Sequence, residues 1–345
     1  MPEPLQIEVT RGELVESVHR AHAAVVDATG SVLYAAGDPE RVTFLRSSAK
    51  PIQALAMAES GAAERFGFTD RELAVMCASH FGEPFHVAAV QSILQKIGLD
   101  EGALACGIHA PTHAPSAEAL IRAGEPPRKI HNNCSGKHAS MLTLCRHAGW
   151  QTEGYTAPDH PVQVRLRQVL AEMAGVAPED VYVAVDGCNA PVFAIPLRHI
   201  ARAFAVLAQP AAVSPGRNAA IQRISRAMRA HPAMVSGTNG FTTNLMDIAG
   251  DNVVSKSGAE GLFCAGALSQ GWGIAIKMED GSARGHPILV PELLAALRVI
   301  SSEQSERLRE LHAPGVLNTA GVTVGAMRPR FSPTAEILSR EAAPQ

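Results

Sequence analysis

A serine and a lysine three residues apart are the first residues whose types and spacing could do chemistry. They are Ser47 and Lys50, and Pro51 follows directly. Inside a helix the proline ring would clash with the carbonyl group four residues earlier, so Ser47 must lie at or just before a helix start. Lys50 would then lie over Ser47 on one helix face. A hydroxyl beside free N–H groups, with an amine one turn away, is typical of a Ser/Lys nucleophile.

A lysine acts as a base only as an uncharged amine, a form that burial and a second cation favour. Lys256 is the candidate for that cation, because it opens the tripeptide Lys-Ser-Gly. S-x-x-K followed by K-[ST]-G is the signature of serine β-lactamases and penicillin-binding proteins. The simpler interpretation of the first motif is a helix cap beside a solvated lysine.

Two cysteines with lysine, histidine and aspartate nearby form a second group. Cys134, Lys137 and His138 are close in sequence, and about fifty residues further on Asp186 precedes Cys188. Two thiolates and one or two nitrogen donors would suit a tetrahedral Zn²⁺ with an open fourth position. Asp186 could orient a ligand or a bound water. Because neither cysteine belongs to a C-x-x-C pair, buried structural thiols are the alternative.

The composition narrows the class of protein. The chain has 345 residues, and 30 Lys+Arg against 33 Asp+Glu give a net charge of −3, so neither a nucleic acid nor an anionic membrane is an expected partner. The first twenty residues lack the apolar run of a secretory signal, and no stretch is long enough to span a membrane. Six cysteines in such a chain indicate free thiols or metal ligands. We expect a cytoplasmic enzyme.

The order of predicted elements indicates an α/β protein of the α+β type. Apolar runs at 21–26 and 31–36, separated by Asp-Ala-Thr-Gly, predict a hairpin, and two runs at 261–267 and 273–278 predict another. Helical patterns dominate between these hairpins, and a closing helix is predicted over 291–307. We therefore expect an antiparallel or mixed sheet built from both chain ends, with a helical insertion.

Domain boundaries follow from this order. The predicted sheet-containing lobe consists of residues 1–50 and 237–335. The predicted helical lobe, 51–236, carries the cysteine motifs, and 336–345 form a tail.

Five motifs, taken together in this order, resemble the thermolabile, rhizobial-type L-asparaginase family over about residues 8 to 330. They are R-S-S-A-K-P at 46–51, S-H-F-G-E at 79–83, N-C-S-G-K-H at 133–138, D-G-C at 186–188 and K-S-G-A-E-G at 256–261. The resemblance implies a fold similar to serine β-lactamases and glutaminases, a homodimer, and hydrolysis of L-asparagine to L-aspartate and ammonia.

The resemblance also implies roles for individual residues. Ser47 and Lys50 match one Ser/Lys pair, and Ser79 with Lys256 would form a second. The residues that match zinc ligands are Cys134, Lys137 and Cys188, with water as the fourth ligand; those that match substrate-binding residues are His138 and Asp186. Arg46 is a further candidate for binding a carboxylate. Lysine is an unusual ligand because its amine must lose a proton, and from residue types alone His131 or His138 would be the third ligand.

Two other functions remain open at this point. A metal-dependent amidohydrolase would use zinc-bound hydroxide as its nucleophile. A non-catalytic amino-acid or zinc sensor would use Cys134 and Cys188 for regulation. The sequence also leaves open which serine is the nucleophile and whether asparagine is preferred to glutamine.

Overall fold

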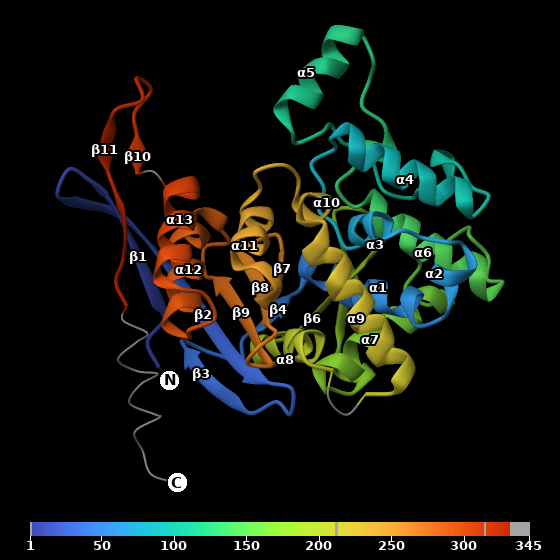
Figure 1. Ribbon diagram of the computed structural model, residues 1–345, viewed down its shortest axis with the longest axis horizontal. Helices are drawn as coiled ribbons and strands as arrows, with labels where there is room; N and C mark the ends of the chain where they lie inside the picture. The colour runs from blue at the N-terminus through green and yellow to red at the C-terminus, as the bar shows by residue number, and fades with distance from the viewer. Residues whose placement is uncertain (1, 211–212, 314, 332–345) are drawn as a thin grey trace. The chain divides into compact units, whose positions relative to one another are not determined.

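The computed structural model describes residues 2–210, 213–313 and 315–331. The chain forms two compact units (Figure 1). The sheet unit consists of Met1–Thr43, Pro196–Gln209 and Asn244–Gln345, and the helical unit consists of Phe44–Ile195 and Pro210–Thr243.

The sheet unit is built on an antiparallel sheet to which both ends of the chain contribute. Its strand order in the described residues is β12-β1-β2-β9-β8-β7, with β3 paired to β2. The strands are β1 (Leu5–Arg11), β2 (Leu14–Asp27), β3 (Val32–Ala36), β7 (Val253–Ser257), β8 (Leu262–Ala267), β9 (Trp272–Met278) and β12 (Met327–Pro329). Strands from the start of the chain, blue in Figure 1, thus pair with orange and red strands from its end. The predicted α+β class and the predicted origin of the sheet are confirmed.

Both predicted hairpins are present. β2 pairs with β3 across a turn in which Gly30 has a φ of 96°, a left-handed conformation that favours glycine. The Asp27 carboxylate accepts hydrogen bonds from the N–H groups of Thr29 and Ser31, which holds this turn. β8 pairs with β9 across the predicted second turn.

Helix α8 (Leu197–Ala208) packs against this sheet, although the predicted helical lobe, 51–236, included it. Gly266 of β8 and Gly273 of β9 lie opposite each other in register. A Cβ atom on Gly273 would lie 1.8 Å from the Ala201 carbonyl oxygen of α8. The helix backbone therefore approaches the sheet so closely that only glycine fits, and this segment belongs to the sheet unit.

The predicted closing helix over 291–307 is two helices. They are α12 (His286–Ala296), with Pro291 inside it, and α13 (Ser302–His312). Ser301 starts α13 through a capping box, in which its hydroxyl accepts from the Gln304 N–H and the Gln304 side chain accepts from the Ser301 N–H. Shorter elements are α11 (Phe241–Ala249), β10 (Val316–Leu317) and β11 (Thr323–Gly325). The predicted tail, 336–345, lies outside the described residues.

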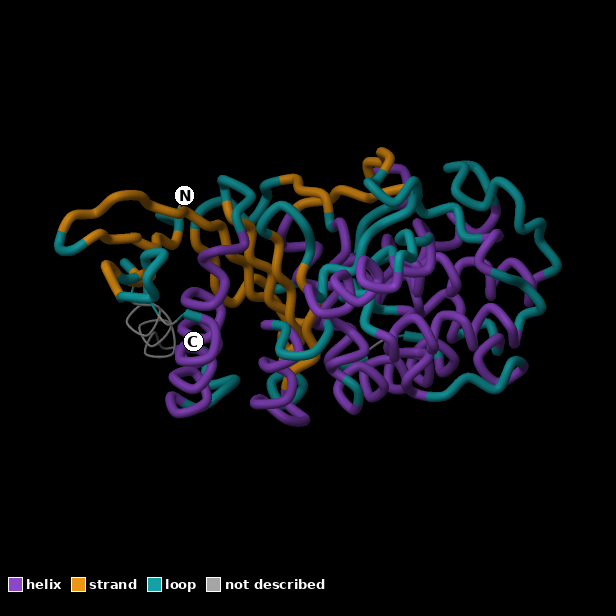
Figure 2. Tube along the Cα trace, turned by 90° about the horizontal axis from the view of Figure 1, so that it is seen from above, coloured by secondary structure: helices purple, strands orange, loops and turns teal. Residues whose placement is uncertain are grey.

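The helical unit consists mainly of helices, purple in Figure 2. Its elements are β4 (Val42–Phe44) at the unit boundary, α1 (Lys50–Ala58), α2 (Ala62–Arg65), α3 (Asp70–Met76), α4 (Pro84–Lys96), α5 (Ala114–Ala123), α6 (Ser135–Ala148), α7 (Pro161–Ala174), β5 (Tyr182–Val185), β6 (Pro191–Pro196), α9 (Pro215–Ala230) and α10 (Pro232–Ser236). All residues of α1 are buried, and α6, α7 and α9 pack around it. In the described parts of the chain, no helix has the length and apolar character needed to cross a bilayer.

Helices α3 and α4 are joined by a buried carboxylate. Glu72 accepts hydrogen bonds from Lys96 Nζ at 2.7 Å, from Ser92 Oγ at 2.8 Å, and from the Thr69 backbone N–H at 2.7 Å. Burial opposes the charge on Glu72, but the bonds from Lys96, Thr69 and Ser92 outweigh it and hold the pKa of Glu72 below its usual value.

We expect Glu72→Gln to destabilise the protein by about 1–3 kcal/mol at pH 7. Because the pKa of Glu72 is lower in the folded state, its carboxylate stabilises the fold above the unfolded-state pKa of about 4.3. That stabilisation is lost as the pH falls through the folded-state pKa, so the variant should differ less from the wild type at pH 3. Thermal unfolding at both pH values measures this effect, with Glu118→Gln, in an exposed ion pair, as the control. An equal effect of Glu72→Gln at both pH values would contradict the prediction.

Candidate active site

Ser47 lies in the turn that leads into α1. A short 3₁₀ helix, Arg46–Ala49, runs directly into α1, and the N–H of Lys50 donates to the carbonyl of Ser47. Pro51 occupies the first turn of α1, where its missing N–H costs no helical hydrogen bond. The prediction that Ser47 lies at the helix start is confirmed. Ser47 is partly exposed, as a residue that reaches a substrate must be.

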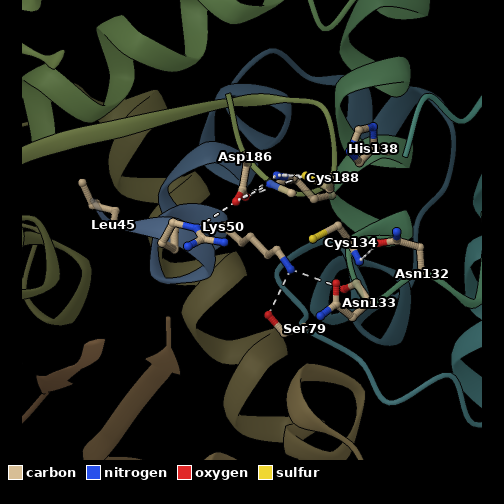
Figure 3. A network of polar contacts seen from close by, with 12 residues as sticks. Leu45, Lys50, Ser79, Asn132, Asn133, Cys134, His138, Asp186 and Cys188 are labelled. Atoms are coloured by element: carbon tan, nitrogen blue, oxygen red, sulfur yellow. Dashed lines mark hydrogen bonds and ion pairs between the residues drawn. The ribbon is translucent and has the colours of Figure 1, made fainter. Parts of the chain in front are cut away.

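Lys50 is only 1% exposed, and its amine is surrounded by acceptors. Nζ donates to the carbonyl oxygen of Ala78 at 2.6 Å. It also donates to Ser79 Oγ at 3.0 Å and to the carbonyl oxygen of Asn133 at 3.3 Å (Figure 3). Among the described residues, the hydroxyl bonded to Lys50 is therefore that of Ser79 and not that of Ser47. Proton transfer between Ser47 and Lys50 stays a prediction.

Ser79 lies in the segment between α3 and α4. Its backbone N–H donates to the carbonyl oxygen of Val235, at 3.0 Å, in α10. The hydroxyl of Ser79 points toward the amine of Lys50 in Figure 3. The structure thus brings together Lys50 and Ser79, which the sequence analysis assigned to different Ser/Lys pairs.

Cys134, Lys137 and Cys188 form a buried cluster. Each is at most 5% exposed. Cys134 precedes α6, Lys137 lies in its first turn, and Cys188 follows β5. Lys137 Nζ donates to Cys188 Sγ at 3.0 Å, and the Cys188 thiol is hydrogen-bonded to Cys134. The structure therefore brings together the three residues predicted to hold zinc.

The charges in this cluster alternate. The hydrogen bond from Cys188, together with the nearby Lys50 and Lys137 charges, lowers the pKa of Cys134 well below its usual value despite burial. The same bond and burial raise the pKa of Cys188. Burial opposes the charge on Lys137, but Cys134, Cys188 and Asp186 outweigh it and raise the pKa of Lys137. Without a metal, Lys137 is an ammonium group.

Asp186 connects this cluster to Arg46. Arg46 Nε donates to Asp186 Oδ1 at 2.8 Å, and Lys137 Nζ lies 3.8 Å from Asp186 Oδ2. Burial opposes the charge on Asp186, but Lys137 and Arg46 lower the pKa of its carboxyl group. Arg46 has a φ of 48°, a strained conformation for a residue with a side chain. Arg46 thus combines this backbone conformation with the ion pair, immediately before Ser47.

His138 is fully buried and contacts Tyr155, a residue that the sequence analysis missed. The N–H of Ala105 donates to the Tyr155 hydroxyl oxygen at 2.9 Å, and His138 Nδ1 lies 2.6 Å from the same oxygen. Burial and the charges of Lys137 and Lys50 lower the pKa of His138 well below its usual value, so the ring is neutral. No spacing relates Tyr155 to His138, because Tyr155 lies in an irregular loop.

Lys256 lies on β7 of the sheet unit. Its side chain is fully buried, and Nζ donates to the carbonyl oxygen of Ser257 at 2.8 Å. The predicted pairing of Lys256 with Ser79 stays a prediction.

The donor types of the thiol cluster fit a zinc ion. Two sulfurs and one amine nitrogen are ligands that tetrahedral zinc accepts, and Cys188 contacts both other residues. In the described residues, no group of three or more His, Cys, Asp and Glu side chains could hold a metal ion. The predicted set includes a lysine instead, whose amine must release its proton to bind the ion.

We expect Tyr155→Phe to destabilise the protein by about 1–3 kcal/mol, because it leaves the Ala105 N–H and His138 Nδ1 buried without their partner. Thermal unfolding measures the change. Tyr182→Phe is the matched control, since the Tyr182 side chain is largely exposed. Equal stability of Tyr155→Phe and the wild type would refute a structural role of this hydroxyl.

Several solved structures are similar to this chain. A β-lactamase from Mycobacterium bovis is 16% identical, with 85% of this chain and 95% of that chain covered and a TM-score of 0.45. A structure titled Mglu is 15% identical, with 82% and 68% covered and a TM-score of 0.46. A mutant of simvastatin synthase from Aspergillus terreus is 13% identical, with 74% and 86% covered and a TM-score of 0.36.

The family of the chain follows from a match over nearly its whole length. No curated protein matches the sequence. The family model of L-asparaginase II matches residues 7–329, a range that includes each of the motifs on which the resemblance was based. The protein belongs to the L-asparaginase II family and is a hydrolase that acts on the amide of asparagine.

Proposed function

We propose that the protein hydrolyses L-asparagine to L-aspartate and ammonia through an acyl-enzyme formed on Ser47. We choose Ser47 rather than Ser79 as the nucleophile because their backbone N–H groups differ in hydrogen bonding. The N–H of Ser79 is bonded to the Val235 carbonyl oxygen, whereas the N–H of Ser47 has no acceptor among the described residues. A free N–H at a helix start can stabilise the oxyanion that forms when the neighbouring hydroxyl attacks.

The reaction proceeds in two steps. Uncharged Lys50 takes the proton of Ser47, whose oxygen attacks the side-chain amide carbon, and the C–N bond breaks as the nitrogen leaves as ammonia. Water then attacks the ester and releases aspartate. The 3.0 Å contact between Lys50 Nζ and Ser79 Oγ supports a relay in which Ser79 passes the proton from Lys50 to the leaving nitrogen. Lys256 would favour the uncharged form of Lys50, as the second cation.

Substrate binding is assigned to the charged residues next to Ser47. The α-amine of asparagine fits the Asp186 carboxylate, and its α-carboxylate fits Arg46, which can form paired hydrogen bonds. Their ion pair supports this assignment, because it includes Arg46, which directly precedes Ser47 in the chain. The buried neutral ring of His138 would contact the substrate nearby.

A zinc ion is proposed as the cofactor of the thiol cluster. Cys134, Lys137 and Cys188 would hold it, and when bound it would supply a positive charge that orients the α-carboxylate or α-amine of the substrate. A homodimer and a cytoplasmic location, as in the sequence analysis, stay predictions.

The choice of nucleophile is tested by comparing Ser47→Ala with Ser79→Ala. We expect Ser47→Ala to lower kcat for asparagine by about 10⁴-fold or more, since no acyl-enzyme can form. Ser79→Ala should lower kcat by about 10²–10⁴-fold, the range for the loss of a proton-transfer group. Ammonia release gives the rates, and mass spectrometry of quenched enzyme locates the acyl group. An acyl group on Ser79, or near-full activity of Ser47→Ala, would make Ser79 the nucleophile.

The role of zinc is tested by Cys134→Ala and by chelation. We expect both to raise KM more than they lower kcat, because the ion binds substrate and does not supply the nucleophile. Cys145→Ala is the matched control: it removes a buried thiol near the C-terminal end of α6, and it should bind zinc like the wild type. Loss of all activity on chelation, with recovery on adding zinc, would favour attack by zinc-bound hydroxide. Zinc binding without any ammonia release from asparagine would favour a sensor.

A further inference from the structure

His80 joins the segment of Ser79 to the segment of Cys134, and the mechanism above does not use it. His80 follows Ser79 and is 1% exposed, and Ser135 follows Cys134 and is fully buried. The ring nitrogen Nε2 of His80 lies 2.8 Å from Ser135 Oγ. On the other side of the ring, the Gly82 N–H donates to Nδ1 at 3.1 Å.

These contacts determine the direction of every hydrogen bond. A backbone N–H can only donate, so Nδ1 of His80 must carry a lone pair. The proton of the neutral ring then lies on Nε2 and is donated to Ser135 Oγ. Ser135 donates its own proton to the carbonyl oxygen of Ile130 at 3.0 Å. Burial lowers the pKa of His80 well below its usual value, which agrees with this neutral form.

Backbone contacts bring the same two segments together. The N–H of His80 donates to the carbonyl oxygen of Asn133 at 3.3 Å, and Lys50 Nζ donates to that same oxygen. A Cβ atom on Gly136, in the first turn of α6, would lie 2.0 Å from the carbonyl oxygen of Val75 in α3. The start of α6 therefore lies directly against the end of α3, and the bond from His80 to Ser135 is a side-chain link between the segments that meet here.

We propose that His80 is a positioning residue for amide hydrolysis. Its neutral ring, bridged to Ser135, sets the position of the Ser79 hydroxyl relative to Cys134 and Lys137. The inference rests on the proposed function, in which Ser79 relays protons while Cys134 and Lys137 serve substrate binding. A hydroxyl displaced by about 1 Å can cost up to about 10² in rate, so the bridge controls kcat although His80 itself does not contact the substrate.

Two substitutions of His80 separate its two hydrogen bonds. In His80→Asn, the side-chain oxygen can still accept from the Gly82 N–H, but the shorter side chain does not reach Ser135. In His80→Gln, the amide nitrogen can reach Ser135 and donate to it. Ser135→Ala removes the bridge from its other end. The matched control is Thr143→Val, which removes a buried hydroxyl of α6 that bonds the carbonyl oxygen of Ala139 within the helix.

Steady-state kinetics with asparagine provide the first measurement. His80→Asn and Ser135→Ala should each lower kcat by about tenfold or more and change KM by less than about threefold. The double variant should resemble either single variant, because both break the same bridge. His80→Gln should retain kcat within about threefold, and Thr143→Val should match the wild type. Wild-type kcat in folded His80→Asn or Ser135→Ala, or losses that multiply in the double variant, would overturn the proposal.

Amide hydrogen exchange provides a second measurement that needs neither activity nor zinc. The amides of Ser79 and His80, bonded to Val235 and Asn133, should exchange about tenfold faster in His80→Asn and Ser135→Ala but not in Thr143→Val. If the wild type did not hydrolyse asparagine, the proposed function would fail. Amide exchange would then still test whether the His80–Ser135 hydrogen bond holds the segment of Ser79 in place. Wild-type exchange rates in both variants would overturn it. If His80→Asn does not fold, Ser135→Ala, which removes a single oxygen atom, decides the outcome.

Discussion

The burial of two lysine amines is the constraint on which the candidate site depends. Lys50 and Lys137 are 1% and 4% exposed. A buried ammonium group costs several kcal/mol unless each of its protons has an acceptor. Lys50 Nζ has three acceptors, two backbone carbonyls and the hydroxyl of Ser79, and Lys137 has a hydrogen bond to Cys188 and an ion pair with Asp186. The segments that carry these acceptors must therefore converge around the start of α1 and α6.

Alternation of charge follows from the same constraint. From the edge of the site inward, the sequence of charges is Arg46 (positive), Asp186 (negative), Lys137 (positive) and the Cys134–Cys188 pair (negative). Each buried charge thus lies near one of opposite sign, which a low-dielectric interior demands. The buried histidines of the unit are neutral for the same reason, since further cations here would have no counterion. A zwitterionic amino acid carries one positive and one negative charge, so it could pair with the oppositely charged groups of this series.

The residues of the candidate site differ in how rigidly the fold holds them. Lys50 projects from α1, whose residues are all buried, and Lys137 projects from a first turn in which Gly136 touches the backbone of α3. Ser47, by contrast, is partly exposed in a turn that begins with the strained Arg46. A buried amine held by a well-packed helix and a partly exposed hydroxyl are both features that a nucleophilic mechanism uses.

Local features of the site could be predicted from the sequence because their causes lie within a few residues. Pro51 restricts where a helix can begin, so it located Ser47 at the start of α1, and the turn residues before Val32 located a hairpin. The spaced motifs identified the family, and the family model matches residues 7–329, a range that includes all of them. The capping box of Ser301 was also visible in principle, as a serine followed three residues later by a glutamine.

Tertiary structure alone decided which groups meet. Several of these contacts join distant parts of the chain: Lys50 bonds to Ser79, Tyr155 bonds to His138, and α8 packs on the sheet. Two of the acceptors of Lys50 are backbone carbonyls, which every residue possesses, so no residue type marks them in a sequence. Their positions depend on how helices pack, and packing is a property of the whole fold rather than of any local pattern.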